Sequence, residues 1–142
     1  MNREILFKAK RRDNGEWVEG SLINTKKGVA YIIRSKSKAF IPKGKNIICS
    51  AECYEIDPDT ICQFTGLTDK NGKKIWENDI LIIEDGTLDE EDGCFICKWD
   101  DYAARYILDG NGLIADFDNV DTRYVEIIGN IFDNADLLEV KL

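Results

Sequence analysis

The residue types best suited to chemistry in this chain of 142 residues are its five cysteines. Cys94 and Cys97 have the spacing of a zinc or redox pair, and Cys49 with Cys53 supplies the potential other half of a zinc site. Cys94 and Cys97 fall in an apparent strand, however, where residues three apart point to opposite faces, whereas metal ligands must converge. An odd count of cysteines without a secretion signal favours reduced thiols over disulfides. We therefore predict no metal site and no cofactor.

The chain contains no histidine, which removes the commonest general base and the commonest metal ligand. Acidic residues are dense in segment 84–93, but their spacing does not match a calcium loop, so a solvated loop is the simpler interpretation. Further acids that leave a metal-dependent hydrolase open as a third hypothesis are Asp100, Asp101, Asp116, Asp118 and Asp121. No catalytic residue is assigned, and a protein without enzymatic activity is the favoured class.

The net charge of −8 hides a strong asymmetry along the chain. Residues 1–50 hold twelve Lys and Arg against four Asp and Glu, a net charge of +8. Residues 75–142 hold four against 18, a net charge of −14. Two interpretations follow: the halves attract each other, within a monomer or head to tail between subunits, or the basic half binds an anionic partner.

Basic residues interleaved with aromatic residues in the first half are the candidate binding residues. This pattern occurs in proteins that bind single-stranded nucleic acid. Strand alternation is expected to turn the aromatic side chains to the core and the lysines to water, so a solvated face is the alternative, and a pI of about 4.6 weakens the nucleic-acid interpretation. The candidates are Lys8, Lys10, Arg12, Trp17, Lys26, Arg34 and Lys36.

Short β-strands are the elements expected to position these residues, because the dominant hydrophobic period is two. Ile5, Phe7 and Ala9 alternate with mostly polar residues, and the pairs Asn14-Gly15 and Asn71-Gly72 are typical of hairpin turns. No helical pattern extends beyond two turns. Strands spaced about 8–12 residues apart indicate a mainly β protein, a barrel or small sheets, with few short helices.

The candidate domain boundary falls near Pro58, where Asp57–Thr60 is typical of a turn or of the cap of a short helical turn. We predict a β-rich N-terminal part, 1–58, and a second domain, 59–142. No apolar run approaches the roughly 18–20 residues that a membrane span requires. The first residues lack the apolar region of a signal peptide. We expect a cytoplasmic protein without membrane association.

Three segments resemble the YopX family, small proteins encoded mostly by phages and prophages. The start of the chain with Asn14–Val18 is similar to the family's opening hairpin, and Gln63–Lys73 to its central motif. Val125–Asn134 is similar to its closing block. The chain departs from the family at Glu77-Asn78-Asp79, where Asn78 replaces a glycine. Asparagine is the next best residue in a left-handed turn, so we expect the turn to be kept.

The resemblance implies a C-terminal small Src-homology-type (SH3-like) β-barrel after a β-rich N-terminal part. It implies no activity. The favoured hypothesis is therefore a phage or prophage accessory protein without catalytic activity that binds an unidentified macromolecule or forms a homo-oligomer. The alternative is a nucleic-acid-binding protein that uses the basic N-terminal half.

Overall fold

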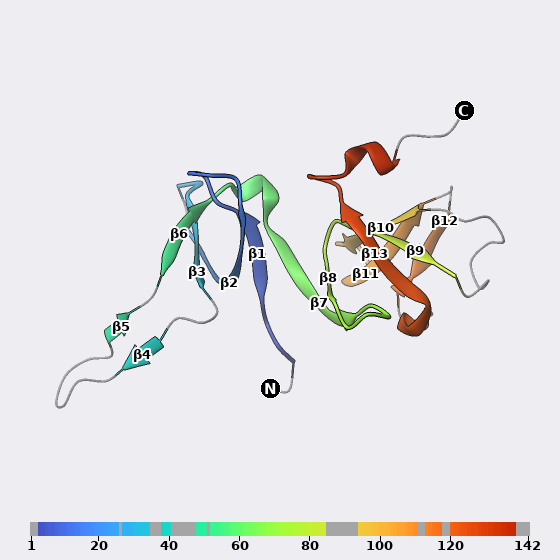
Figure 1. Ribbon diagram of the computed structural model, residues 1–142, viewed down its shortest axis with the longest axis horizontal. Helices are drawn as coiled ribbons and strands as arrows, with labels where there is room; N and C mark the ends of the chain where they lie inside the picture. Colours follow the sequence, from blue (N-terminus) through green and yellow to red (C-terminus); the bar gives the residue numbers. More distant parts are fainter. Residues whose placement is uncertain are drawn as a thin grey trace. The chain divides into compact units, whose positions relative to one another are not determined.

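The protein divides into two compact units, residues Met1–Gln63 and Phe64–Leu142. The boundary follows a few residues after the one expected near Pro58. The structure is a computed structural model, shown in Figure 1. The residues that it describes are 3–25, 27–34, 38–40, 48–50, 52–84, 94–110, 113–117 and 120–138.

The first unit is built on an antiparallel sheet in the strand order β6-β3-β2-β1, and the start of β7 pairs with β1. A separate ladder joins β4 to β5, and one short 3-10 helix, η1, precedes β7. The bounds are β1 Phe7–Lys10, β2 Trp17–Asn24, β3 Ala30–Arg34, β4 Lys38–Phe40, β5 Ile48–Ser50, β6 Cys53–Ile56, η1 Pro58–Thr60 and β7 Cys62–Thr68.

The predicted alternation produces the core of the first unit. The buried residues of β2 and of β3 lie two positions apart on one side of the sheet, as the period of two requires, and β1 adds the buried Ala9. Gly15, in the predicted turn before β2, has a φ of 72°, a conformation that glycine adopts without strain. The buried cluster consists of Ala9, Val18, Ala30, Ile32 and Ile56.

The residues that follow β1 pair with β6, the strand at the other side of the sheet. The first sheet is therefore strongly coiled. Arg11 forms an isolated bridge with Ile56, and the Arg12 N–H donates to the carbonyl of Glu55 at 3.1 Å. The hydroxyl of Thr60 in η1 accepts a hydrogen bond from the Lys10 N–H at 2.9 Å. These contacts place the basic residues that follow β1 beside the acidic residues of β6.

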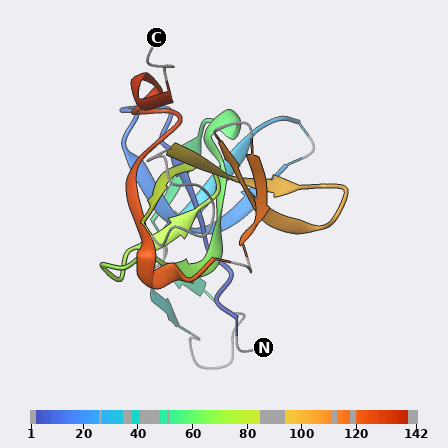
Figure 2. The ribbon, with the colours of Figure 1, turned by 90° about the vertical axis from the view of Figure 1, so that its right-hand side faces the viewer.

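The second unit contains a five-stranded antiparallel sheet in the order β12-β11-β10-β9-β13, and β8 pairs with β7. Two short 3-10 helices, η3 and η4, flank β13, and η4 follows it closely in Figure 2. The bounds are β8 Lys74–Trp76, β9 Asp79–Ile83, β10 Cys94–Asp100, β11 Arg105–Gly110, β12 Leu113–Asp116, η3 Thr122–Tyr124, β13 Val125–Asn130 and η4 Ala135–Leu138. The prediction of a mainly β protein with few short helices is confirmed.

The expected barrel is not confirmed. Strands β12 and β13 form the two edges of the five-stranded sheet, and within the described residues no ladder joins them. Strand β12 was also missed by the sequence patterns, because it is only four residues long and follows directly on a Gly/Asn-rich stretch. Within the described residues the five-stranded sheet is therefore open.

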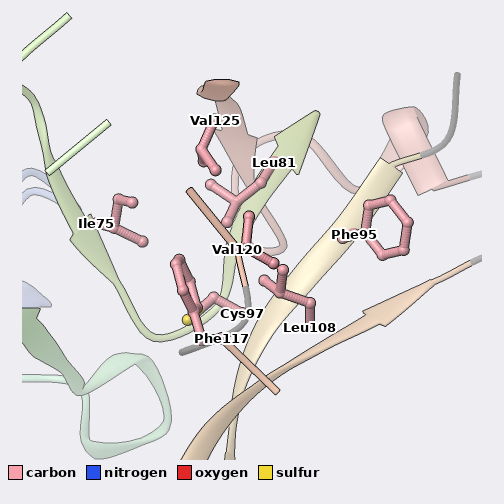
Figure 3. Packing of buried hydrophobic residues seen from close by; sticks show 8 residues of the cluster. All are labelled: Ile75, Leu81, Phe95, Cys97, Leu108, Phe117, Val120 and Val125. Carbon is pink, nitrogen blue, oxygen red and sulfur yellow. The ribbon is translucent and has the colours of Figure 1, made fainter. Parts of the chain in front are cut away.

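The core of the second unit gathers side chains from β8 to β13 (Figure 3). Trp76 is buried, as predicted, and its ring centroid lies 5.6 Å from that of Phe64. Cys97 is fully buried and belongs to this core. The cluster consists of Ile75, Leu81, Phe95, Cys97, Leu108, Phe117, Val120 and Val125.

Candidate functional site

Five of the seven candidate binding residues lie in the described part of the first unit. They are distributed over both faces of the sheet rather than over one. Lys26 and Lys36 lie outside the described residues. The five that the structure places are Lys8, Lys10, Arg12, Trp17 and Arg34.

Lys8, Lys10 and Trp17 form one cluster on the face of the sheet opposite to the core. Lys10 pairs with Trp17 across β1 and β2, and Lys8 pairs with Glu19. The Nζ atoms of Lys8 and Lys10 lie 4.6 and 5.4 Å from the centroid of the Trp17 ring. These are cation–π distances. The expectation that Trp17 faces the core was wrong, because the register buries Val18 and turns Trp17 to the lysine face.

A pocket of about 380 Å³ opens near the end of the same strands. The guanidinium carbon of Arg11 lies 4.0 Å from the ring centroid of Tyr54. Arg34 ends β3 and lines the pocket together with these two residues. The complete lining consists of Arg11, Glu16, Trp17, Val18, Glu19, Arg34 and Tyr54.

The arginines of the pocket are held by acidic partners. Arg11 pairs with Asp13 at 2.6 Å, and Arg34 pairs with Glu52 at 2.8 Å. The hydroxyl of Tyr54 donates to the same Glu52 carboxylate at 3.0 Å. The hydrogen bonds from Arg34 and Tyr54 lower the pKa of Glu52, so this carboxylate stays charged at neutral pH.

This surface carries both positive and negative side chains, which the count of charged residues over residues 1–50 did not reveal. Arg12 pairs with Glu55 at 3.0 Å, and Arg34 pairs with Glu52, so both partners come from beyond that segment. Tyr54 and Arg11 are functional candidates that the sequence prediction missed. Tyr54 lies two residues before the buried Ile56 in β6, so strand alternation would have placed Tyr54 on the core side of this strand.

A second hollow of about 340 Å³ shares Tyr54 with the first pocket. Its lining includes the exposed free thiol of Cys53 and the ion pair between Arg12 and Glu55. The two hollows make one continuous candidate surface around Tyr54. We call the residues that line the first pocket, together with Lys8 and Lys10, the Tyr54 surface.

The metal and redox alternatives find no support in the described residues. No group of three or more cysteine or acidic side chains in those segments is arranged to hold a metal ion. Cys94 is half-buried and Cys97 is fully buried, on opposite faces of β10 as the strand period predicts. Asp118 and most of the acidic segment 84–93 lie outside the described residues.

The turn Asp69–Lys73, which is part of the central motif, is a structural site. Asp69 is buried, and its Oδ1 atom accepts hydrogen bonds from the N–H groups of Asn71 and Lys73 at 2.9 and 3.0 Å. Its Oδ2 atom accepts one from the N–H of Ile127 at 3.1 Å. Burial opposes ionisation of Asp69, but the three N–H donors outweigh it and hold the pKa below its ordinary value of 3.8.

The turn at Glu77–Asp79 keeps the geometry that the sequence predicted. Asn78 has a φ of 70°, in the left-handed region. Its N–H donates to the carbonyl of Cys97 at 2.7 Å, and its own carbonyl accepts from the N–H of Ile131 at 3.0 Å. Asp79 is buried and accepts from the Trp76 N–H at 2.8 Å. This turn thus serves the fold and not a reaction.

A family model, described as YopX protein, matches residues 6–139. The chain belongs to the YopX family. The match extends over both units. The Asp69 turn and the closing strand β13 belong to two of the three segments that carried the resemblance, and the Asp69–Ile127 hydrogen bond joins them.

A solved structure has the same fold as this YopX protein. The crystal structure of protein EF1440 from Enterococcus faecalis is similar with a TM-score of 0.68 and 21% sequence identity. The similarity covers 97% of this chain and 100% of that one. No curated protein matches the chain. Within the described segments, no helix has the length and apolar character that crossing a bilayer would need.

Proposed function

We propose that this YopX protein is a binding protein without catalytic activity, which contacts a macromolecular partner through the Tyr54 surface. The observation that carries the proposal is the pocket of about 380 Å³, where arginine side chains and aromatic rings line one concavity. Tyrosine, tryptophan and arginine are the residue types that contribute most to the affinity of protein interfaces. A protein partner is the class that this composition favours.

The side chains of the Tyr54 surface are held in place by their partners, and this preorganisation supports binding. Glu52 holds both the guanidinium of Arg34 and the hydroxyl of Tyr54, and Asp13 holds Arg11. Side chains fixed in this way lose little conformational entropy when a partner binds. The paired arginines still present N–H donors to carbonyl or carboxylate groups of a partner.

The pKa shifts of the described residues fit a binding surface. Apart from Asp69, which holds a turn, the shifted groups belong to exposed ion pairs, and those at the pocket, Arg11 with Asp13 and Arg34 with Glu52, have pKa values shifted toward the charged form. A general acid or base instead has a pKa shifted toward the operating pH. The proposal also includes an accessory role in a phage or prophage and a cytoplasmic location. It further includes an SH3-like fold of the second domain, which the antiparallel sheet of the second unit supports.

Nucleic-acid binding is the second candidate function. Lys8 and Lys10 beside the Trp17 ring favour it, because cations next to an exposed ring suit phosphates and stacked bases. The acidic partners of the three nearby arginines oppose it, since they add negative charge where phosphates would approach.

A comparative capture experiment tests the proposed function. Tagged wild-type protein and the variants Arg34→Glu and Trp17→Ala are incubated with bacterial lysate, and retained proteins are quantified by mass spectrometry. Tyr124→Ala is the matched control, because Tyr124 is an exposed aromatic residue of the other unit. We expect one set of proteins to bind to the wild type and the control and to be lost from both variants. Identical binding by all four proteins would refute a role of the Tyr54 surface.

A further inference from the structure

The tip of the hairpin formed by β10 and β11 carries exposed aromatic side chains. Tyr102 in the connecting turn is fully exposed, and Trp99 is exposed at the end of β10. The ring centroids of Trp99 and Tyr106 lie 5.0 Å apart in an edge-to-face arrangement. In Figure 2 the hairpin extends away from the other strands of the second unit.

Trp99 is exposed although it shares a face of β10 with buried residues. Phe95, Cys97 and Trp99 lie on one face of β10, and the first two are buried in the core. Trp99 pairs with Tyr106, which is half-buried and packs against the core. Trp99 and Tyr102 therefore form an exposed aromatic ledge next to the core. Exposed apolar ledges of this kind mark interaction sites.

The ledge is negatively charged, and a local hydrogen bond closes its turn. The Tyr102 N–H donates to the Asp100 carboxylate at 3.0 Å, and Ala104 adopts a φ of 53° in the turn. The nearest basic residues are already paired: Lys98 with Asp109 at 2.8 Å and Arg105 with Asp116 at 2.9 Å. Asp100 and its neighbour Asp101 therefore determine the charge around Tyr102. A partner must offer a cavity for the ring and positive charge at its rim.

The first unit of the same chain offers that combination. Residues 1–63 contain twelve Lys and Arg and eight Asp and Glu, a net charge of +4, whereas residues 64–142 contain seven and 19, a net charge of −12. The pocket of about 380 Å³ is lined by Trp17 and Tyr54 together with two arginines and two glutamates, whose charges balance. The positive charge at its rim comes from Lys8 and Lys10, which lie beside the Trp17 ring. We propose that this pocket receives the Tyr102 tip of a second copy of the chain, in a head-to-tail contact.

In this contact the Tyr102 ring packs against Trp17 and Tyr54, and Asp100 and Asp101 approach the lysines. The two surfaces differ, so the contact is heterologous and propagates into a ring or a filament. The proposal rests on the proposed function because it names a partner for the Tyr54 surface. It adds that the partner is the protein itself.

Sedimentation velocity of the full chain over a wide concentration range tests the contact. We expect association at low salt that weakens as salt rises, because exposed charges are screened. Tyr102→Ser and the double variant Lys8→Glu/Lys10→Glu should each weaken association about tenfold or more. Tyr124→Ser, an exposed position at the other end of the sheet, and Lys27→Glu, an exposed position in the turn before β3, should behave like the wild type.

A mixing experiment separates this contact from a symmetric one. Each single-surface variant retains one intact surface, so a mixture of Tyr102→Ser with Lys8→Glu/Lys10→Glu should form a heterodimer that grows no further. A mixture that stays monomeric would contradict the proposal, as would a wild-type protein that is monomeric at high concentration and low salt. In that case a variant-sensitive set of captured proteins would still support the proposed function of the Tyr54 surface.

Discussion

The carboxylate of Asp69 accepts a hydrogen bond from the backbone N–H of Ile127 at 3.1 Å, across 58 residues of sequence. The same side chain closes its own turn through Asn71 and Lys73. One buried carboxylate thus connects the turn after β7 to strand β13. This residue joins two of the three segments that resemble the YopX family, whereas the third, the opening hairpin, carries Trp17 of the candidate binding surface.

Replacing Asp69 by asparagine should destabilise the protein by about 3 kcal/mol, because hydrogen bonds to a buried charged group contribute about 1.5–3 kcal/mol each. Asparagine keeps one acceptor oxygen but presents an NH₂ group to a backbone donor. Urea unfolding of the second unit's signal measures the loss. Asp136→Asn in the exposed helix η4 is the control and should change stability by less than about 0.5 kcal/mol. Equal stability of both variants would contradict the structural role of Asp69.

The same carboxylate gives stability a defined pH dependence. The folded protein holds the pKa of Asp69 below 3.8, so the unfolded chain binds this proton more readily. The contribution of Asp69 is therefore complete above its unfolded pKa and is lost as the pH falls through the lower, folded pKa. Acid titration of the unfolding midpoint should show a steeper loss in the wild type than in Asp69→Asn. Parallel profiles would contradict this assignment.

Gly129 has no room for a side chain, because a Cβ atom there would overlap the side-chain amide of Asn134. We expect Gly129→Ala to cost about 1–3 kcal/mol. Asn134→Gly removes the whole side chain, including the Cβ atom that Asn134→Ala would leave 2.8 Å from the new Cβ atom. It costs the hydrogen bond from the Asn130 N–H, about 1 kcal/mol, but should relieve the clash. The double variant should therefore be more stable than the sum of the single effects predicts, as measured by a thermodynamic cycle.

The variant Gly110→Ala is the control for that thermodynamic cycle. A Cβ atom at Gly110 would overlap the backbone carbonyl of Cys94, which no side-chain truncation removes. Gly110→Ala should therefore be destabilising in every background. If Asn134→Gly rescued Gly110→Ala as well as Gly129→Ala, the effect would be general and not steric.

Substitutions of Asn78 test whether the turn between β8 and β9 requires the left-handed conformation. Because its φ is 70°, Asn78→Gly should retain full stability, and Asn78→Ala should lose about 1–2 kcal/mol. Thermal unfolding of the two variants beside the wild type measures the difference. Equal melting temperatures for the alanine and glycine variants would show that this turn relaxes to another conformation.

Nucleic acid should bind weakly to this surface if the paired acids dominate it. We expect no measurable association with single-stranded DNA at about 200 mM salt and a shallow salt slope down to about 50 mM, because few phosphate-bound cations would be displaced. Fluorescence anisotropy of a labelled oligonucleotide measures both. Tight binding at low salt that Lys8→Glu/Lys10→Glu abolishes would favour the nucleic-acid function instead.

Local patterns were enough to predict a mainly β protein. Alternating apolar residues located β1, and the pair Asn14-Gly15 located the first hairpin turn, because period and turn chemistry are properties of short segments. The sequence also determined the family, the absence of histidine and the charge asymmetry between the two ends of the chain.

Only the tertiary structure decided the surface. Strand register turned Trp17 toward Lys10 and buried Val18, and a shift by one residue would have reversed both. The bridge between Arg11 and Ile56 brought Tyr54 under the Arg11 guanidinium. The pairing of β3 with β6 brought Glu52 to Arg34. These partners are more than a dozen residues apart, so no local pattern specifies them. The basic half of the sequence became a mixed, preorganised pocket because folding selects neighbours by register and burial, not by position in the chain.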